Sequence, residues 1–384
     1  MTRIPPATMV TTTASLRAYC DRWAAEPLLA IDTESNSLHA YEEQVCLIQL
    51  STREADFIID PLTIESLDPL GELLANPAIE VVFHAAEYDI MCLKRDFGFR
   101  FSNLFDTMLA ARICGADKLG LGSMLEEHFG VKVNKKYQRA NWGERPLSKE
   151  MLHYAQLDTH FLPALRDYWR EQLIAMGRWE EAQETFAMLT ETPAATPHFD
   201  PDGFWRINGA HKLSPQQIAI LRELFLLREE KARQRDYPPF KIMSDRVLME
   251  LAQLAPQSIS ELQRSSSLSS HQIRRYGREI LSAIERGRQA TPPRRPNNQR
   301  PTDIVMARFE ALRDWRKHRA RRRGVESDII ISKDALWALA RVAPRTVEEL
   351  QKIHELGPWK TRTYGSEILD VLATVERQNH RRKS

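Results

Sequence analysis

The sequence contains few cysteines and no long apolar segment. Its four cysteines, Cys20, Cys46, Cys92 and Cys114, include no CxxC pair, so nothing indicates a disulfide framework or a structural zinc site. No run approaches the roughly 18 consecutive apolar residues of a membrane span, and the N-terminal residues lack the apolar segment of a secretory signal. We therefore expect a cytoplasmic protein with reduced cysteines and no membrane association.

Charge is distributed unevenly along the 384 residues, although the net charge is only +2. Residues 1–200 contain 18 Lys or Arg and 30 Asp or Glu, whereas residues 201–384 contain 36 and 22. This length and a hydrophobic content of 42% allow two or three domains with apolar cores. The charge asymmetry favours an acidic catalytic or metal-binding part joined to a part that binds nucleic acid.

Strand-like and helical patterns alternate in the N-terminal half. Buried strands are expected at residues 28–31, 45–51, 55–59, 79–83 and near 105, the second and third forming a hairpin. Helices are expected at residues 13–24, 65–75, 88–97, 107–114, 120–129 and 148–173. This order predicts an α/β domain with a mixed sheet and flanking helices, over residues 1–200 with a core at about 26–175.

Two Pro-rich segments, near residues 191–204 and 291–301, predict linkers, and only helical patterns lie beyond the first. Ala255-Pro256 and Tyr276-Gly277 recur as Ala343-Pro344 and Tyr364-Gly365, at a constant offset of 88. Upstream, Leu227-Arg228 matches Leu312-Arg313 at an offset of 85, which predicts a three-residue insertion in the second copy. Two copies predict tandem all-α domains, over residues 205–290 and 302–380.

Acidic residues follow the predicted strands of the N-terminal domain. Asp32 and Glu34 end the first strand and face the same side, because side chains alternate along an extended backbone. Asp89 follows a second strand, and Tyr154 and Asp158 lie one turn apart on a helix. Carboxylates without a Cys/His cluster favour Mg²⁺ or Mn²⁺. Two such ions about 4 Å apart hold the attacking water and the leaving oxygen of a phosphodiester in line.

These motifs resemble those of a known family. Asp32-Thr33-Glu34, Asp89 and the Tyr154–Asp158 pair resemble the three motifs of the tyrosine-bearing branch of the DEDD exonucleases. The repeated unit resembles the HRDC domain of RecQ-type helicases and of ribonuclease D, and the whole layout, over about residues 26–378, resembles bacterial ribonuclease D. The resemblance implies a ribonuclease H-like α/β exonuclease domain followed by two small all-α HRDC domains.

The resemblance also implies an activity: 3′→5′ hydrolysis of RNA that releases 5′-mononucleotides, with trimming of tRNA precursor 3′ ends as the family's best-known role. Asp32, Glu34, Asp89 and Asp158 would hold two Mg²⁺ or Mn²⁺ ions, and Tyr154 would position the attacking water. We expect a monomer without an obligate protein partner. The alternatives are a DNA exonuclease of the proofreading or Werner type, or an inactive scaffold that binds nucleic acid; the chain has no GxxxxGK[ST] loop of an attached helicase.

Basic residues outside the acidic motifs are candidates for RNA contact. Lys136 and Gln138 precede the last motif, and we expect them to contact phosphate. Arg321, Arg322 and Arg323, together with Arg319, precede Gly324 in the second repeat and form a patch that attracts phosphate.

Two further side chains of the N-terminal domain have structural interpretations. Asp106 is expected to be a helix N-cap and His84 to support the site without binding metal.

Two positions depart from the family pattern. Ser35 stands where many ribonuclease D sequences have a bulky apolar residue, which leaves substrate preference open. The first repeat has no glycine that matches Gly357, which we expect to weaken its contacts with nucleic acid.

Overall fold

The computed structural model describes residues 4–195, 199–264, 267–295 and 301–383. Parts of both predicted linkers, residues 196–198 and 296–300, lie outside the described residues. The chain divides into two compact units: residues 1–34, 45–195 and 299–384 form one, and residues 35–44 and 196–298 form the other. The exonuclease-like domain and the second repeat therefore belong to the same unit, while the first repeat belongs to a different one.

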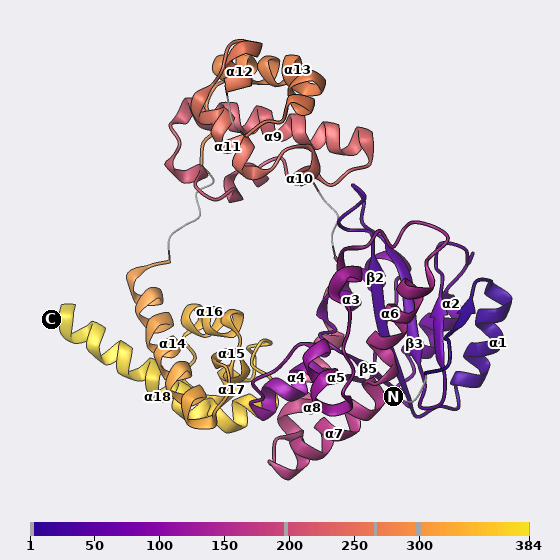
Figure 1. Ribbon diagram of the computed structural model, residues 1–384. Coiled ribbons are helices and arrows are strands. Elements are labelled where there is room, and N and C mark those ends of the chain that lie inside the picture. The colour runs from indigo at the N-terminus through magenta and orange to yellow at the C-terminus, as the bar shows by residue number, and fades with distance from the viewer. Residues whose placement is uncertain (1–3, 196–198, 265–266, 296–300, 384) are drawn as a thin grey trace. The chain divides into compact units, whose positions relative to one another are not determined.

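A six-stranded mixed sheet forms the centre of the N-terminal domain, in the order β1-β4-β3-β2-β5-β6 (Figure 1). Its strands are β1 (Thr8–Val10), β2 (Leu28–Ser35), β3 (Val45–Ser51), β4 (Asp56–Ile59), β5 (Glu80–Phe83) and β6 (Leu104–Asp106). The hairpin pair β3–β4 is antiparallel, whereas β1–β4, β2–β5 and β5–β6 are parallel. The predicted α/β fold with a mixed sheet is confirmed.

Helices cover both faces of this sheet. They are α1 (Thr13–Trp23), α2 (Asp68–Leu74), α3 (Glu87–Phe97), α4 (Thr107–Cys114), α5 (Leu121–Phe129), α6 (Lys149–His160), α7 (Leu162–Ala175) and α8 (Trp179–Thr190). Along β2, Leu29 and Ile31 pack with α1, α2 and α3, while Leu28 and Ala30 pack with α4, α7 and α8. This alternation places Asp32 and Glu34 on the face of Leu28 and Ala30.

The helix expected at residues 148–173 is two helices in the structure. Phe161 separates α6 from α7, and Pro163 lies in the first turn of α7. N–H groups in the first turn of a helix have no partner within that helix, so proline is tolerated there. The strand β1 and the helix α8 were not expected from the sequence.

The two repeats are helical and align at one offset. The first contains η2 (Gly203–Arg206), η3 (Ala210–Lys212), α9 (Pro215–Arg235), α10 (Pro239–Ile242), α11 (Asp245–Leu254), α12 (Ile259–Arg264) and α13 (Ser270–Gln289). The second contains α14 (Asp303–Arg323), α15 (Ser327–Ile330), α16 (Lys333–Val342), α17 (Val347–Leu350) and α18 (Pro358–Lys383). Helices α14, α15, α16, α17 and α18 begin 88 residues after α9, α10, α11, α12 and α13, respectively.

The predicted three-residue insertion in the second repeat is wrong. Arg228 donates to the carbonyl oxygen of Met243 at 3.2 Å, and Arg316 donates to that of Ile331 at 3.0 Å. The equivalent of Arg228 is therefore Arg316, 88 residues later. Arg321 lies in the last turn of α14, so the arginine patch ends a helix and does not fill an inserted loop.

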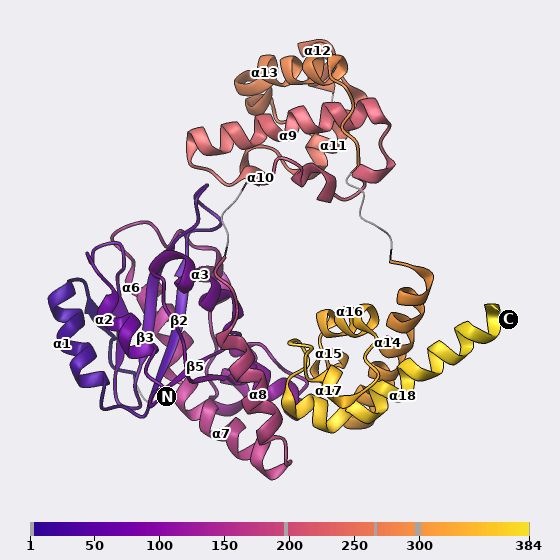
Figure 2. The same ribbon diagram turned by 180° about the vertical axis from the view of Figure 1, so that it is seen from behind.

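The second repeat packs against the exonuclease-like domain through α8 (Figures 1 and 2). Ile329 of α15 is buried in the same apolar cluster as Phe105, Trp169 and Phe186. No helix in the described part of the chain is long and apolar enough to cross a membrane.

Candidate active site

Asp32 and Glu34 lie at the end of β2, directly after four fully packed residues. Burial raises the pKa of Asp32 well above its ordinary value, and the carboxylates of Asp89, Asp158 and Glu34 raise it further. Burial, followed by the charges of Asp158 and Asp89, raises the pKa of Glu34 to about 9. The two acids at the strand end are thus within electrostatic reach of both other predicted ligands.

Asp89 is placed by the turn between β5 and α3. Ala85 in this turn has a left-handed backbone, with φ of 65°. The carboxylate of Asp106 accepts hydrogen bonds from the N–H groups of Ala85 at 3.2 Å and Ala86 at 2.7 Å, just before α3 begins. One turn into α3, the hydroxyl of Thr33 donates to the carboxylate of Asp89. This contact joins the first helical turn to the middle residue of the acidic strand motif.

Asp106 also caps α4, because its carboxylate accepts from the N–H of Leu109 at 2.9 Å. The predicted N-cap is confirmed, and the same side chain additionally holds the turn before Asp89. His84 lies beside Thr107, with 2.9 Å between its Nδ1 atom and the threonine hydroxyl oxygen. Burial lowers the pKa of His84, the largest influence on it. His84 therefore lies between the turn that precedes Asp89 and the start of α4.

Tyr154 and Asp158 lie on the face of α6 that packs on the sheet, and both are buried. Burial and then the charge of Asp89 raise the pKa of Asp158. A polar network orients this helix: the carboxylate of Asp56 accepts from Gln156 at 2.7 Å and from Ser51 at 2.6 Å, and lies 2.8 Å from Nδ1 of His160. These contacts fix α6 to β3 and β4 on both sides of Asp158.

The loop before α6 encloses Tyr154. The rings of Tyr137 and Trp142 lie 5.9 and 6.1 Å from the Tyr154 ring, centroid to centroid. Arg145 fixes this loop by pairing with Asp60 at 2.7 Å and donating to backbone carbonyls on both sides, those of Trp142 and Cys46. The aromatic enclosure of Tyr154 thus depends on one ion pair, whose carboxylate is buried.

Lys136 and Gln138 lie in η1 (Lys135–Arg139), and both side chains are exposed. The side chain of Gln138 hydrogen-bonds the hydroxyl of Tyr154. Burial and then the charges of Asp158, Glu34 and Asp32 raise the pKa of that hydroxyl. Gln138 is therefore a direct neighbour of the acidic site, while Lys136 lies on the outside of the same turn, over the ring of Tyr137.

The donor set suits hard divalent cations. Asp32, Glu34, Asp89 and Asp158 supply only carboxylate oxygens, the ligands that Mg²⁺ and Mn²⁺ prefer. The neighbouring charges that raise their pKa values are carboxylates, whereas a bound cation would favour the ionised form of each. Across the described ranges, no three Asp, Glu, His or Cys side chains meet closely enough to hold an ion by themselves. The fit therefore rests on donor chemistry and mutual repulsion, not on a preformed ligand shell.

Arg323 does not lie on an open basic surface. Its guanidinium pairs with Glu181 of α8 at 2.6 Å and donates to the hydroxyl of Tyr364. Glu181 is only 1% exposed and Arg323 only 15%, so the pair is buried at the junction of the two domains. Arg321 and Arg322 are exposed in the same helical turn.

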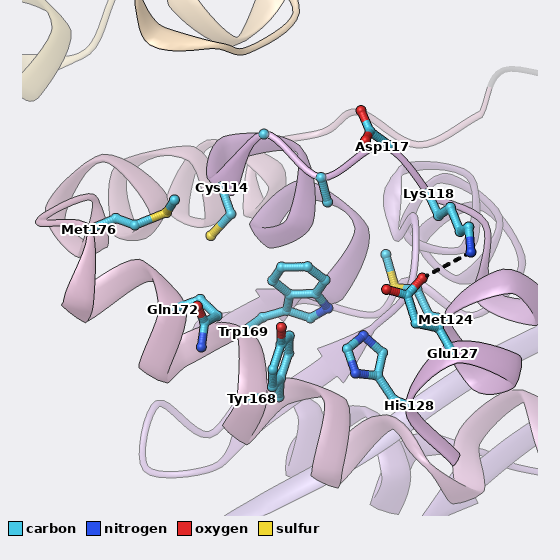
Figure 3. Close-up of a pocket in the computed structure, with 12 residues that line it drawn as sticks. Cys114, Asp117, Lys118, Met124, Glu127, His128, Tyr168, Trp169, Gln172 and Met176 are labelled. Atoms are coloured by element: carbon cyan, nitrogen blue, oxygen red, sulfur yellow. Dashed lines mark ion pairs between the residues drawn. The ribbon is translucent and has the colours of Figure 1, made fainter. Parts of the chain in front are cut away.

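The exonuclease-like domain also contains a pocket of about 330 Å³ (Figure 3). It is lined by α4, α5 and α7, with Trp169, Tyr168 and His128 among its side chains and an ion pair between Lys118 and Glu127 at its rim. None of the five predicted site residues lines it. The acidic residues at the end of β2 and on α3 and α6 are therefore not part of the lining of this pocket.

Comparison with known proteins agrees with this architecture. A 3′-5′ exonuclease family model matches residues 7–174, and an HRDC domain model matches residues 217–284 and 305–372. The chain is thus a 3′→5′ exonuclease of ribonuclease H-like fold with two helical HRDC domains.

Full-length relatives specify the family. Ribonuclease D of Acidiphilium cryptum is 31% identical over 95% of this chain and 93% of that protein, and ribonuclease D of Jannaschia sp. is 29% identical over 94% of each. The crystal structure of Escherichia coli RNase D, an exoribonuclease involved in structured RNA processing, superposes with a TM-score of 0.68 at 26% identity, over 96% of this chain and 99% of that one. The chain belongs to the ribonuclease D family and is a hydrolytic, metal-dependent 3′→5′ exoribonuclease.

Two functional contacts were missed by the sequence interpretation. Thr33 was treated as a spacer between two acids, yet it donates to Asp89. Arg145 was only part of a quoted segment, although it holds the loop around Tyr154. Side-chain alternation points Thr33 away from the face of Asp32, which is the one signal that could have identified it.

Proposed function

We propose that Asp32, Glu34, Asp89 and Asp158 hold two divalent cations, Mg²⁺ or Mn²⁺, at which RNA is cleaved from its 3′ end. The observation that carries this proposal is that carboxylates from β2, α3 and α6 lie close together, so that Asp89 and Asp158 raise the pKa of Asp32 and Glu34. Such ions acidify a water molecule and offset the charge that develops on the scissile phosphate. The protein's own contribution is to fix four carboxylates on three elements that pack on one sheet.

Tyr154 positions the attacking water. Because burial and nearby carboxylates raise its pKa, its hydroxyl remains protonated at neutral pH and does not act as a base. The hydrogen bond from Gln138 and the rings of Tyr137 and Trp142 restrict its orientation. A fixed hydroxyl lowers the entropy cost of bringing water in line with the phosphate.

The substrates are RNAs with 3′ extensions, tRNA precursors foremost, and the products are 5′-mononucleotides. Lys136 contacts substrate phosphate next to the site, and Gln138 contacts both the RNA and Tyr154. Arg321 and Arg322 add sequence-independent attraction, whereas Arg323 is engaged by Glu181. The enzyme acts as a cytoplasmic monomer, with domains at residues 1–200, 205–290 and 302–380.

The Asp32→Asn variant tests the role of the acidic site. A 3′-extended tRNA, and matched single-stranded RNA and DNA, are incubated with the full chain in Mg²⁺ or Mn²⁺, and the products are identified. We expect the wild type to release 5′-mononucleotides from RNA and Asp32→Asn to lower the rate at least about 10²-fold. The control Asp117→Asn makes the same chemical change at an exposed acid and retains full activity.

The variant's melting temperature separates catalysis from folding. Removing one of four repelling carboxylates should leave it unchanged or raise it. Unfolding of Asp32→Asn would make the residue structural. Binding of RNA without hydrolysis by the wild type would indicate a scaffold, and faster digestion of DNA than of RNA would indicate a DNA exonuclease.

A further inference from the structure

The second HRDC domain contains a basic groove of about 700 Å³ between α14, α16 and α18. Three arginines reach it from two of these helices and from the turn after α16: Arg308, Arg341 and Arg345. The groove is separate from the arginines at the end of α14, because none of those residues lines it.

Among the described residues, two of these three arginines form no ion pair, although the carboxylate of Glu349 lines the same groove. Arg308 pairs with Glu376 at 2.5 Å and donates to the backbone oxygen of Ala340 at 3.2 Å. Over the described part of the chain, neither Arg341 nor Arg345 forms an ion pair, and both side chains are exposed. Glu349 is engaged by the backbone N–H of Arg345 at 2.7 Å. The groove therefore presents two available guanidinium groups.

An aromatic stack lies next to Arg341, one of the arginines that line the groove. The rings of Phe309 and Trp337 lie 4.0 Å apart, centroid to centroid, at an interplanar angle of 19°. The guanidinium of Arg341 lies over the Trp337 ring, 5.5 Å from its centroid. A planar cation backed by an indole is a surface on which a nucleobase stacks. Cationic and stacking groups thus occur together within one helical turn of α16.

The first HRDC domain lacks this arrangement at the equivalent positions. Ile220 and Gly287 replace Arg308 and Val375, and a Cβ atom on Gly287 would lie only 2.5 Å from the Cα atom of Ile220. Helices α9 and α13 therefore touch where the second copy has its groove.

The groups that would bind a ligand are also replaced in the first copy. The residues equivalent to Trp337, Arg341 and Arg345 are Met249, Gln253 and Gln257. The groove is a feature of the second copy, and not a consequence of the shared helical framework.

We propose that this groove binds single-stranded RNA, with phosphates at Arg341 and Arg345 and a base stacked on the Arg341–Trp337 surface. The proposal rests on the proposed exoribonuclease function and names one of its RNA-holding surfaces. An acidic peptide would be attracted by the same charges, but it offers no planar group to the stack. The combination of cations and stacked rings therefore favours RNA.

Residues of the first copy supply the test variants. Arg341→Gln/Arg345→Gln and Trp337→Met are made in the full-length protein, in each case with Asp32→Asn to prevent hydrolysis. Binding of a fluorescein-labelled single-stranded oligoribonucleotide is measured by anisotropy between 50 and 300 mM salt, values chosen to span about a sixfold range. The control Lys333→Gln/Lys352→Gln removes two exposed charges of the same domain that do not line the groove.

The two variants should weaken binding in different ways. Loss of two phosphate contacts lowers the salt slope by about 1.4, since single strands lose about 0.7 per neutralised phosphate. Trp337→Met weakens binding at least about fivefold and leaves the salt slope unchanged, because stacking releases no counterions. The lysine control retains the wild-type slope, and the melting temperatures of all variants stay within about 3 °C, as expected for surface changes.

Three results would overturn the proposal: unchanged affinity in both variants, an equal loss in the lysine control, or displacement of RNA only by an acidic peptide that binds more tightly. None of these three results contradicts the catalytic function, provided that the wild type hydrolyses RNA. Conversely, the wild type could bind RNA through the groove and hydrolyse none of it. That result would refute the exoribonuclease function but support the proposed role of the groove.

Discussion

The two HRDC domains share an internal framework, but equivalent residues contact different parts of the chain. In the first, Arg235 donates to the hydroxyl of Tyr276, and in the second, Arg323 donates to that of Tyr364. Arg323 also forms a buried ion pair with Glu181 of the exonuclease domain. The shared Arg–Tyr contact belongs to the HRDC fold, whereas the ion pair belongs to the junction.

Two glycines of the second HRDC domain, at positions where the first has other residues, also distinguish the two copies. Gly324 and Gly357, both with positive φ, occupy the positions of Asp236 and Ser269 in the first copy. At Gly357, the carboxylate of Glu184 accepts from the N–H groups of Trp359 and Lys360 at the start of α18. The second copy thus replaces its own helix cap with a carboxylate from the exonuclease domain. The glycine missing from the first copy is therefore one that the second copy needs for this contact; its expected effect on nucleic-acid binding stays a prediction.

Breaking the buried ion pair should produce the largest difference between the copies. We expect Arg323→Met to cost about 3–5 kcal/mol, because it leaves the Glu181 carboxylate buried without its partner. Arg235→Met removes the hydrogen bond to Tyr276 and the contact of the guanidinium with the Tyr237 ring, and should cost about 1–2 kcal/mol. Urea denaturation with hydrogen exchange on peptides of α8 and α13 measures the two losses separately. Equal costs at the two positions would show that the junction contributes nothing.

Gly357→Ala should have the next largest effect. Its Cβ atom would lie 2.4 Å from the Glu184 carboxyl carbon, so the carboxylate must leave the start of α18. Gly98→Ala is the matched control, since Gly98 has φ of 66° and open space around its Cβ position. We expect about 1–2 kcal/mol of backbone strain in both variants and a further ~1 kcal/mol at Gly357 from the lost cap. Thermal unfolding of the two variants measures the difference between their stability losses. Equal losses would show that the Glu184 contact does not stabilise the fold.

A smaller effect is expected at the exposed rim of the junction. Arg112 pairs with Glu326 and Asp328 at 2.6 Å each, but these partners are 60% and 51% exposed. Arg112→Gln should therefore cost less than about 1 kcal/mol, and the difference should disappear in high salt. Arg53→Gln removes another exposed pair, with Asp167, that lies inside the exonuclease domain. Only Arg112→Gln should accelerate hydrogen exchange in α15. If Arg53→Gln accelerates it as well, the acceleration results from the change in net charge and not from loss of the Arg112 pairs.

The sequence predicted the sheet and the position of its acids because both follow local rules. A buried run that ends in Asp32 and Glu34 is visible without knowledge of any contact, as is the capping position of Asp106. The break at Phe161 could also have been predicted, since Pro163 cannot continue a helix that requires its N–H. These features depend on neighbours within a few residues.

The remaining features depend on residues far apart in the chain. Helix α8 was overlooked, although it supplies Glu181 and Glu184 to the junction. The role of Arg323 could not be inferred either, because its partner lies 142 residues away and an arginine-rich helix end is equally suited to phosphate. Charge pattern predicts attraction in general, but only packing determines which charge is already paired.

Lys360 offers the finest test of the junction, through pH. Its side chain is buried where the first copy has Gln272, and burial lowers its pKa, against the opposing charges of Glu184 and Glu181. A lysine with a lowered pKa in the folded state binds fewer protons when folded than when unfolded. Its cost to the stability of the fold is therefore largest at low pH and declines as the pH rises towards the ordinary lysine pKa of about 10.4.

Lys360→Met, which keeps the length and removes the charge, should equal or slightly exceed the wild type in stability at pH 7. The difference should shrink by pH 9.5, measured as paired melting temperatures. A wild type that loses stability relative to Lys360→Met as pH rises would mean that the buried ammonium stabilises the junction through its two carboxylates.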